Sequence, residues 1–175
     1  MNQAMKVLTS KETTEWYTPT EYIDMVRAVL GDIDLDPASA VYPQSWIQAK
    51  VYYTFQGTKS GSKKALDQQP PWIGNVWLNA PFDNTAAWTK RMQHEYTSGN
   101  MQQGIQLVNS NLGYNWFEEV WREHTVCFVR DRIAFINEMG KRPGPSKQGQ
   151  AFIYYGEDDH LFRRVFGMIG RIIQP

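Results

Sequence analysis

The chain has 175 residues, of which 42% are hydrophobic and 14% aromatic, a composition that excludes a disordered chain. Its length fits one domain of the usual ~100–200 residues. Eighteen basic residues balance eighteen acidic ones, so a DNA-binding surface would need local clusters of basic residues rather than a high overall charge.

The first helix is predicted to start near Thr18. Residues 1–14 are polar and without periodicity, so we expect a flexible N-terminal segment there and one domain over residues 15–175. Thr18 is placed as the N-cap, Pro19 as the first helical residue and Glu21 as the third residue of a capping box. An apolar stripe follows, and Gly31 ends the helix.

The remaining elements alternate between strands and helices over the first two thirds of the chain. We expect strands at 33–35, 76–78, 104–108, 126–129, 132–136 and 151–155, and helices at 84–97, 114–121 and 161–169. The segment 41–72 is predicted to be irregular, because it contains a loop rich in Gly, Ser and Lys and a pair of prolines. This order predicts a mixed, mostly parallel α/β sheet.

Three polar segments directly follow predicted strands, at residues 36–39, 79–82 and 109–111. Ligands of open α/β sheets bind beyond the carboxyl ends of the strands. We therefore expect these three segments to meet at one edge of the sheet and to form the functional site.

Targeting segments, cysteine and histidine give information on the cellular compartment and on metal binding. No signal-peptide pattern and no apolar run of about 18 residues is present, so we expect a soluble, cytoplasmic protein without membrane contact. The single cysteine, Cys127, lies in an apolar run and is predicted to be a core residue rather than a nucleophile. The three histidines lack the spacing of metal ligands, so no metal site is predicted.

The segment Asn79-Ala80-Pro81-Phe82 contains groups that suit the binding of an adenine whose exocyclic amine must act as nucleophile. That amine is a weak nucleophile because its lone pair is delocalised into the ring. The Asn79 side-chain oxygen and the Ala80 carbonyl could accept its two protons, and Phe82 could stack on a base flipped out of the duplex. Asn and Pro also favour ordinary turns, so the motif alone leaves both interpretations open.

Several short motifs occur in a fixed order between residues 15 and 156. They are Glu15-Trp16-Tyr17-Thr18-Pro19, Leu35-Asp36-Pro37-Ala38-Ser39, Val76-Trp77-Leu78-Asn79-Ala80-Pro81-Phe82, Glu95-Tyr96 with Gly99-Asn100, Leu107-Val108-Asn109, Trp116-Phe117, Arg132-Ile133-Ala134-Phe135 and Gly149-Gln150-Ala151-Phe152. In this order and spacing they resemble the phage-type Dam family of DNA adenine-N6 methyltransferases. The resemblance implies a Rossmann-like methyltransferase fold, S-adenosylmethionine as cofactor and double-stranded DNA as substrate.

The resemblance also implies roles for individual residues. Tyr17, Thr18 and Pro19 match the family's segment that contacts the methionine end of the cofactor. The turn after the first strand matches Asp36, Pro37 and Ala38, and Asp36 is expected to pair with the methionine ammonium. The catalytic tetrapeptide, normally Asn-Pro-Pro-Tyr or a close relative, matches Asn79, Ala80, Pro81 and Phe82.

Two departures from the family pattern are visible. Ala80 replaces the first proline, but alanine still supplies the backbone carbonyl, and the lost rigidity is worth about 0.4–1 kcal/mol. Lys63 and Lys64 stand where the family carries acidic residues. They indicate either a loop that contacts DNA phosphate or a weakened cofactor pocket. Asp67 could supply the acidic group, or it is a solvated loop residue.

The loop 139–147 is basic and rich in Pro and Gly, which suits a DNA contact on a rigid scaffold. The predicted DNA-binding residues are Lys63, Lys64, Arg132, Lys141, Arg142 and Lys147. An ordinary solvated loop is the alternative for 139–147, and a local ion pair or turn beside Asp131 is the alternative for Arg132.

The motifs and the resemblance together imply an adenine-specific DNA methyltransferase that uses base flipping, is phage-encoded and acts in the host-cell cytoplasm. Whether it serves in restriction–modification is left open. Two alternatives remain open: transfer of a different group to a DNA base, and a non-catalytic DNA- or partner-binding remnant of the fold. The recognised bases and the oligomeric state are not predicted.

Overall fold

The computed structural model describes residues 16–54, 66, 67, 69–110 and 112–175. The predicted flexible segment 1–14 and the predicted DNA-contacting residues Lys63 and Lys64 lie outside the described residues.

The described strands form one seven-stranded mixed sheet in the order β2-β1-β3-β4-β6-β5-β7. The strands are β1 (Leu35–Ser39), β2 (Val51–Thr54), β3 (Gly74–Leu78), β4 (Met101–Asn109), β5 (Thr125–Val129), β6 (Gln150–Tyr155) and β7 (Gly170–Ile173). The pairs β1–β2, β1–β3 and β3–β4 are parallel, whereas β6 is antiparallel to β4 and β5, and β7 is antiparallel to β5. Strands β1 to β5 thus share one direction, as the predicted mixed, mostly parallel sheet requires.

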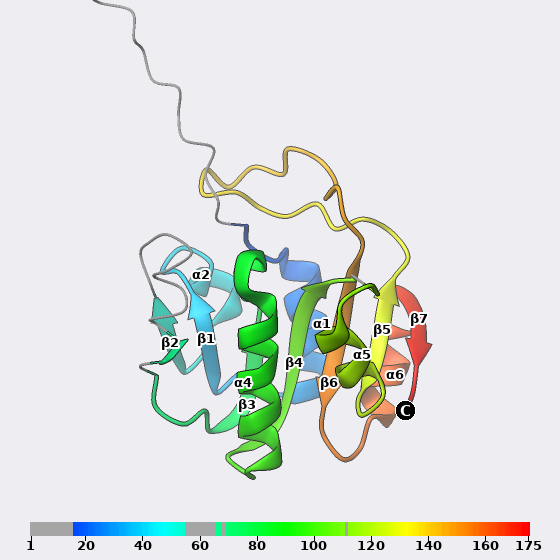
Figure 1. The fold of residues 1–175 in the computed structure, drawn as a ribbon. Helices are drawn as coiled ribbons and strands as arrows, with labels where there is room; N and C mark the ends of the chain where they lie inside the picture. Colours follow the sequence, from blue (N-terminus) through cyan, green and yellow to red (C-terminus); the bar gives the residue numbers. More distant parts are fainter. Residues whose placement is uncertain (1–15, 55–65, 68, 111) are drawn as a thin grey trace, which may run out of the picture.

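Helices cover both faces of the sheet (Figure 1). They are α1 (Thr20–Leu30), α2 (Gln44–Ile47), α4 (Thr85–Thr97), α5 (Asn115–Trp121) and α6 (His160–Phe166), with the short 3-10 turn η1 (Phe82–Asn84) before α4. One apolar core joins α1, α2 and α6 to the sheet, and a second joins α4 and α5 to the opposite face. Two cores explain why β3 and β6 are buried on both faces.

Cys127 lies inside the first core, as predicted. Burial raises the pKa of its thiol to about 12, so the reactive thiolate is scarce at neutral pH. The expected strands at 76–78, 104–108, 126–129 and 151–155 and the expected helices at 84–97, 114–121 and 161–169 are confirmed within a few residues at their ends.

The first strand differs from the prediction, because residues 36–39 belong to β1 instead of forming a turn after it. Its pairing with β2 is irregular between Asp36 and Ser39. The irregularity contains Pro37, which has no N–H to donate to a neighbouring strand. The expectation of an irregular segment 41–72 was also wrong, since α2 and β2 form within it.

Thr18 is not the N-cap of the first helix. Helix α1 starts at Thr20, Pro19 is extended at the N-cap position, and no side chain caps the helix. The reason is a β-bridge between Tyr17 and Ile136, whose two backbone hydrogen bonds of 2.8 and 2.9 Å hold the preceding segment in extended geometry. Gly31 ends α1 with a positive φ of 76°, as expected.

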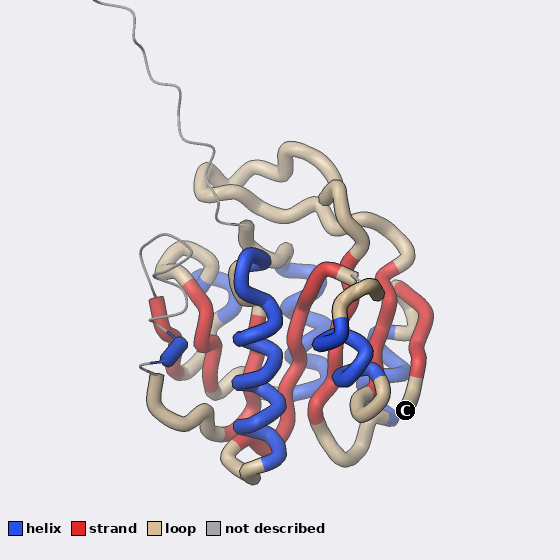
Figure 2. Tube along the Cα trace, in the orientation of Figure 1, coloured by secondary structure: helices blue, strands red, loops and turns tan. Residues whose placement is uncertain are grey.

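Residues 132–136 form no strand beyond this single bridge, so that prediction was wrong. Their apolar pattern arises because Ile133 and Phe135 are buried from within a loop. The loop 130–149 leaves β5 and arches over the carboxyl ends of the strands before it enters β6 (Figures 1 and 2). Strand β7 was not predicted, and it extends the sheet beyond β5.

Gly74 fixes the approach of β1 to β3 at the other end of these strands. It has a φ of +81°, and a Cβ there would lie 2.5 Å from Asp34 Oδ2, the oxygen that accepts the Asn75 N–H at 2.8 Å. Gly31 has a similar φ of +76° but open space around it.

Replacing Gly74 by alanine should therefore destabilise the protein more than Gly31→Ala does. We expect Gly31→Ala to lower the free energy of unfolding by about 1–2 kcal/mol, because of the positive φ alone. The loss should be clearly larger for Gly74→Ala, because the new Cβ also displaces Asp34. Urea unfolding of both variants measures the difference. Equal losses would show that Asp34 moves aside without cost.

Candidate active site

The sheet reverses its strand order at β1 and β3. Strand β1 pairs with β2 on one side and with β3 on the other, and the pairing with β3 has a single register position, Leu35 with Val76. Beyond it β1 and β3 no longer pair with each other on the way to their carboxyl ends. Such a switch point is where open α/β sheets bind ligands. The segments 36–39 and 79–82 both lie there.

Asn79 comes directly after β3 and presents an unused acceptor. Its Nδ2 donates to the Trp16 carbonyl at 3.2 Å, and its buried Oδ1 has no partner among the described residues. A carbonyl oxygen can only accept, so the amide nitrogen must face Trp16. The side-chain oxygen is thereby left for a donor that is not part of the described chain.

The rest of the tetrapeptide leads from β3 into α4. Ala80 is buried, and no hydrogen bond reaches its carbonyl from the described residues. Pro81 is extended with φ of −54° and ψ of 130°. The Phe82 ring is 36% exposed and meets Phe135 edge-on, with 6.1 Å between ring centroids. Phe135 of the arching loop thus contacts this ring, and only about a third of Phe82 stays exposed.

The predicted cofactor segment 17–19 packs on α2. Tyr17 lies 5.6 Å from Tyr42 and 6.4 Å from Trp46 between ring centroids, and Trp46 Nε1 donates to the Thr18 carbonyl at 2.9 Å. The Thr18 hydroxyl is buried and has no partner within the described part of the chain. Thr18 therefore offers a second unused polar group near the end of β1.

Asp36 is a buried carboxyl group without a basic partner in the described residues. Burial raises its pKa to about 6, although hydrogen bonds from Ser39, Ala38 and Gln44 offset part of this rise. Gln44 Nε2 donates to Asp36 Oδ2 at 3.0 Å. The carboxylate is therefore ionised at neutral pH, oriented, and lacks a counter-charge from these residues.

Sequence reasoning missed the residues that hold this carboxylate. Gln44 also donates to the Ser39 hydroxyl at 2.7 Å, and its Oε1 accepts the Ala49 N–H at 2.9 Å. It belongs to the four-residue helix α2, which is too short to show a periodic pattern. Phe135 does stand in one of the family motifs, and that motif was the available signal for its role.

The predicted DNA-binding residues of the described chain lie on the arching loop. Arg142 forms an ion pair with Glu21 through two contacts of 2.6 and 2.8 Å, which also lowers the pKa of Glu21. Arg132 donates to the Lys147 carbonyl at 2.5 Å. The side chains of Lys141 and Lys147 are exposed. The two arginines therefore brace the loop, and the two lysines face solvent.

Metal and membrane features were searched over the described ranges only. Within them, no group of three or more His, Cys, Asp or Glu side chains could hold a metal ion. No helix of those ranges is long and apolar enough to cross a membrane.

The family model described as DNA N-6-adenine-methyltransferase (Dam) matches residues 6–157. The chain belongs to this Dam family. The matched range contains the tetrapeptide, the end of β1 and the whole arching loop, and it confirms the family that the sequence motifs indicate.

Solved structures resemble the chain more distantly. A dimethyladenosine transferase from Plasmodium falciparum is 8% identical, with a TM-score of 0.44, and the match covers 85% of this chain and 65% of that one. The 23S rRNA methyltransferase ErmE is 10% identical, with a TM-score of 0.48, over 85% of this chain and 75% of that one. The chain thus spans about 65% of the length of the Plasmodium protein. No curated protein matches it.

The buried Asp36 should make stability depend on pH in a recognisable way. Its folded pKa of about 6 lies above the usual value of 3.8 for an aspartic acid, so the folded state holds the proton more tightly and loses stability as pH rises through this window. The difference in unfolding free energy between Asp36→Asn and wild type should therefore shift in favour of the variant by about 2.5 kcal/mol between pH 4 and pH 8.

Urea titrations of both proteins across this pH range measure the shift. Comparing the two proteins at each pH removes the titration of all other groups. A difference that stays constant with pH would show that ionised Asp36 costs the fold nothing.

Proposed function

We propose that this protein transfers a methyl group from S-adenosylmethionine to the N6 amine of adenine in double-stranded DNA. The observation that carries the proposal is the buried, unpartnered Oδ1 of Asn79, held beside the Ala80 carbonyl at the switch point of the sheet. Membership of the Dam family supports the choice of adenine and of DNA.

The two oxygens suit activation of the adenine amine. With the Asn79 Oδ1 and the Ala80 carbonyl each accepting one amine proton, the nitrogen lone pair leaves the ring plane and points toward the methyl donor. S-Adenosylmethionine, when bound, supplies a methyl group that its sulfonium already activates. The protein's contribution is then mainly orientation, which can be worth ~7–11 kcal/mol of the barrier.

Phe82 is placed to hold the adenine outside the duplex. Phe82 stands two residues after Ala80, its ring is partly exposed, and Phe135 contacts the ring. Enzymes that act on a duplex base flip it out and hold it by stacking and edge contacts. We therefore assign Phe82 to the face of the base and Asn79 to its edge.

The end of β1 fits the methionine part of the cofactor. An ionised, oriented Asp36 carboxylate without a counter-charge from the described residues is a suitable partner for an ammonium group. The unpartnered Thr18 hydroxyl adds a donor for a carboxylate. The walls of this site would then be formed by Tyr17, Pro19, Pro37 and Ala38.

The arching loop is the proposed DNA contact. Its exposed Lys141 and Lys147 would meet the phosphates, whereas Arg132 and Arg142 shape the loop through the contacts they already make. Lys63 and Lys64 remain proposed contacts on the strength of the sequence. We also propose, from the phage-type resemblance alone, that the enzyme acts in a host-cell cytoplasm and protects DNA from restriction.

Asn79→Ala should slow methyl transfer strongly without abolishing cofactor binding. Losing one preorganised contact to the reacting group costs about 10²–10³ in rate. Purified protein is incubated with unmethylated DNA and labelled S-adenosylmethionine, and the nucleosides are identified by mass. Asn75→Ala is the matched control, since Asn75 lies near the amino end of the same strand β3, away from the tetrapeptide. We expect it to keep activity within a few-fold of wild type.

The outcomes separate the competing functions. Equal transfer by wild type and Asn79→Ala would overturn the assignment of Asn79. A different modified base would indicate transfer of another group. Absence of cofactor binding by the wild-type protein in calorimetry would favour a non-catalytic remnant.

Cofactor affinity should fall as pH decreases through the pKa of Asp36. Only the ionised carboxylate attracts the ammonium, so below about pH 6 the dissociation constant should rise toward tenfold per pH unit. Asp36→Asn should bind weakly and without this dependence. Calorimetric titrations with S-adenosylmethionine at several pH values measure both. A wild-type affinity that stays flat between pH 5 and pH 8 would contradict the pairing.

A further inference from the structure

The end of β1 lacks the normal support of a strand inside a sheet. Its register with β2 shifts between Asp36 and Ser39, and its register with β3 ends at Leu35. Within this stretch the Pro37 carbonyl accepts a hydrogen bond from Gln69 Nε2 at 2.7 Å. A side chain therefore supplies the contact that a neighbouring strand supplies elsewhere.

The Gln69 amide is held in one orientation. Its Oε1 accepts the Trp72 Nε1–H at 2.9 Å while its Nε2 faces the Pro37 carbonyl. An indole nitrogen only donates and a carbonyl only accepts, so a flipped amide would lose both contacts. Trp72 itself is fully buried and stacks on Trp88, with 6.2 Å between ring centroids. Gln69 is thus fixed from the side away from β1.

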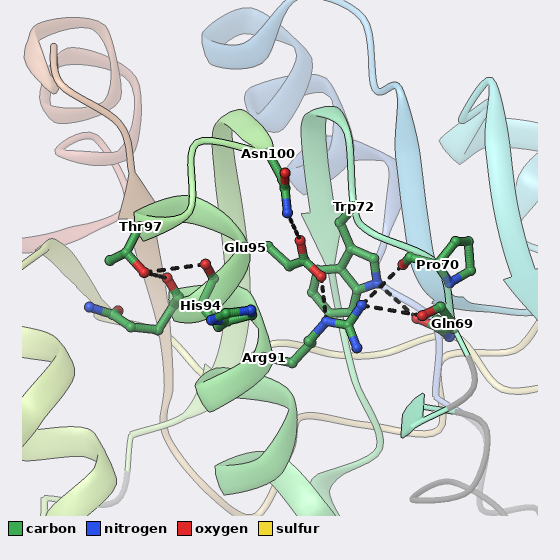
Figure 3. Close-up of polar contacts among 9 residues, drawn as sticks. Gln69, Pro70, Trp72, Arg91, His94, Glu95, Thr97 and Asn100 are labelled. Carbon is green, nitrogen blue, oxygen red and sulfur yellow. Dashed lines mark hydrogen bonds and ion pairs between the residues drawn. The ribbon is translucent and has the colours of Figure 1, made fainter.

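Arg91 of α4 holds the backbone of the same segment (Figure 3). Its Nη2 donates to the Gln69 carbonyl at 3.3 Å and to the Pro70 carbonyl at 3.1 Å, and its guanidinium lies 5.6 Å from the Trp72 ring. Its Nε contacts Glu95 Oε1 at 2.5 Å. One guanidinium therefore joins the helix, the indole and the backbone at Gln69.

Glu95 in turn keeps Arg91 in place. The carboxylate is only 2% exposed, and its second oxygen accepts Asn100 Nδ2 at 2.7 Å. A buried carboxylate needs this pairing, because an unpaired buried charge is strongly destabilising. Helix α4 also starts three residues after Phe82, so one rigid element leaves the tetrapeptide and carries Arg91.

We propose that Gln69 is a positioning residue for the cofactor site, supported by Arg91. It holds the Pro37 carbonyl and thereby keeps the Asp36 carboxylate where Gln44 meets it. This inference rests on the proposed function, because it concerns affinity for S-adenosylmethionine. Gln69 touches neither the methyl group nor the base, so its loss should weaken cofactor binding and leave the Michaelis constant for DNA unchanged.

The test compares Gln69→Leu with Gln103→Leu. Gln103 makes the same kinds of contact, since its Nε2 donates to the Leu30 carbonyl at 3.4 Å and its Oε1 accepts the Tyr154 hydroxyl at 3.0 Å. Calorimetry with S-adenosylmethionine should show roughly three- to tenfold weaker binding for Gln69→Leu, the range expected for one hydrogen bond. Gln103→Leu should bind within twofold of wild type, and steady-state kinetics should show the matching split between the two Michaelis constants.

A double-mutant cycle tests the support by Arg91. Arg91→Lys keeps the charge beside Glu95 but loses the forked reach to the Gln69 and Pro70 carbonyls. It should weaken cofactor binding in the same direction as Gln69→Leu, and the double variant should bind no more weakly than Gln69→Leu alone. If Gln69→Leu does not fold, Arg91→Lys carries the test by itself.

The possible failures are distinguishable. Wild-type affinity in both Gln69→Leu and Arg91→Lys would overturn this inference while the proposed function stands. Equal weakening by Gln103→Leu would also overturn it, because the effect would then be a general loss of stability. A wild-type protein that does not bind S-adenosylmethionine would overturn the proposed function and this inference with it.

Discussion

The end of β1 is the constraint on which the site depends. A proline inside a strand with neighbours on both sides removes a ladder donor, and the pairing of β1 with β3 stops at Leu35. The two parallel strands therefore end apart instead of closing on one another. This separation leaves Asp36 of β1 and Asn79, the residue directly after β3, at the ends of neighbouring strands that no longer pair with each other.

The polar groups of the site are expensive to keep in the absence of ligands. The Asp36 carboxylate is buried with a raised pKa, and the Thr18 hydroxyl and the Asn79 oxygen are buried without partners in the described chain. Each such group costs free energy unless something pairs with it. Local cost at a site is typical of binding and catalytic centres. Here Asp36 and Asn79 lie at the switch point, and Thr18 stands two residues after Trp16, whose carbonyl Asn79 contacts.

Side chains from distant segments compensate for that cost. Gln44 and Gln69 hold the end of β1 from α2 and from the segment before β3, and the Tyr17–Ile136 bridge ties the arching loop to the entrance of α1. The ion pair between Arg142 and Glu21 adds a second tie between the same loop and α1. The proposed DNA contact and the proposed cofactor site therefore share their supports.

Sequence alone was sufficient for the features that depend on local pattern. Alternating apolar runs located most strands, Gly31 marked the end of α1, and Asn79 was correctly placed directly after a buried strand. Motif order identified the family, since many short matches in one order are specific even where each is common. These features need only neighbours in the chain.

Tertiary structure decided what the same residues do. Thr18 is of a residue type that often caps helices. The bridge between the preceding Tyr17 and Ile136, more than one hundred positions away, keeps Thr18 out of the helix. Residues 132–136 have the pattern of a strand, yet Ile133 and Phe135 are buried from a loop. Gln44 and Gln69 carry no local signal, because their partners are set by the packing of α2 and α4 against the sheet. Hydrogen bonds between distant segments depend on the folded arrangement, and local sequence does not encode them.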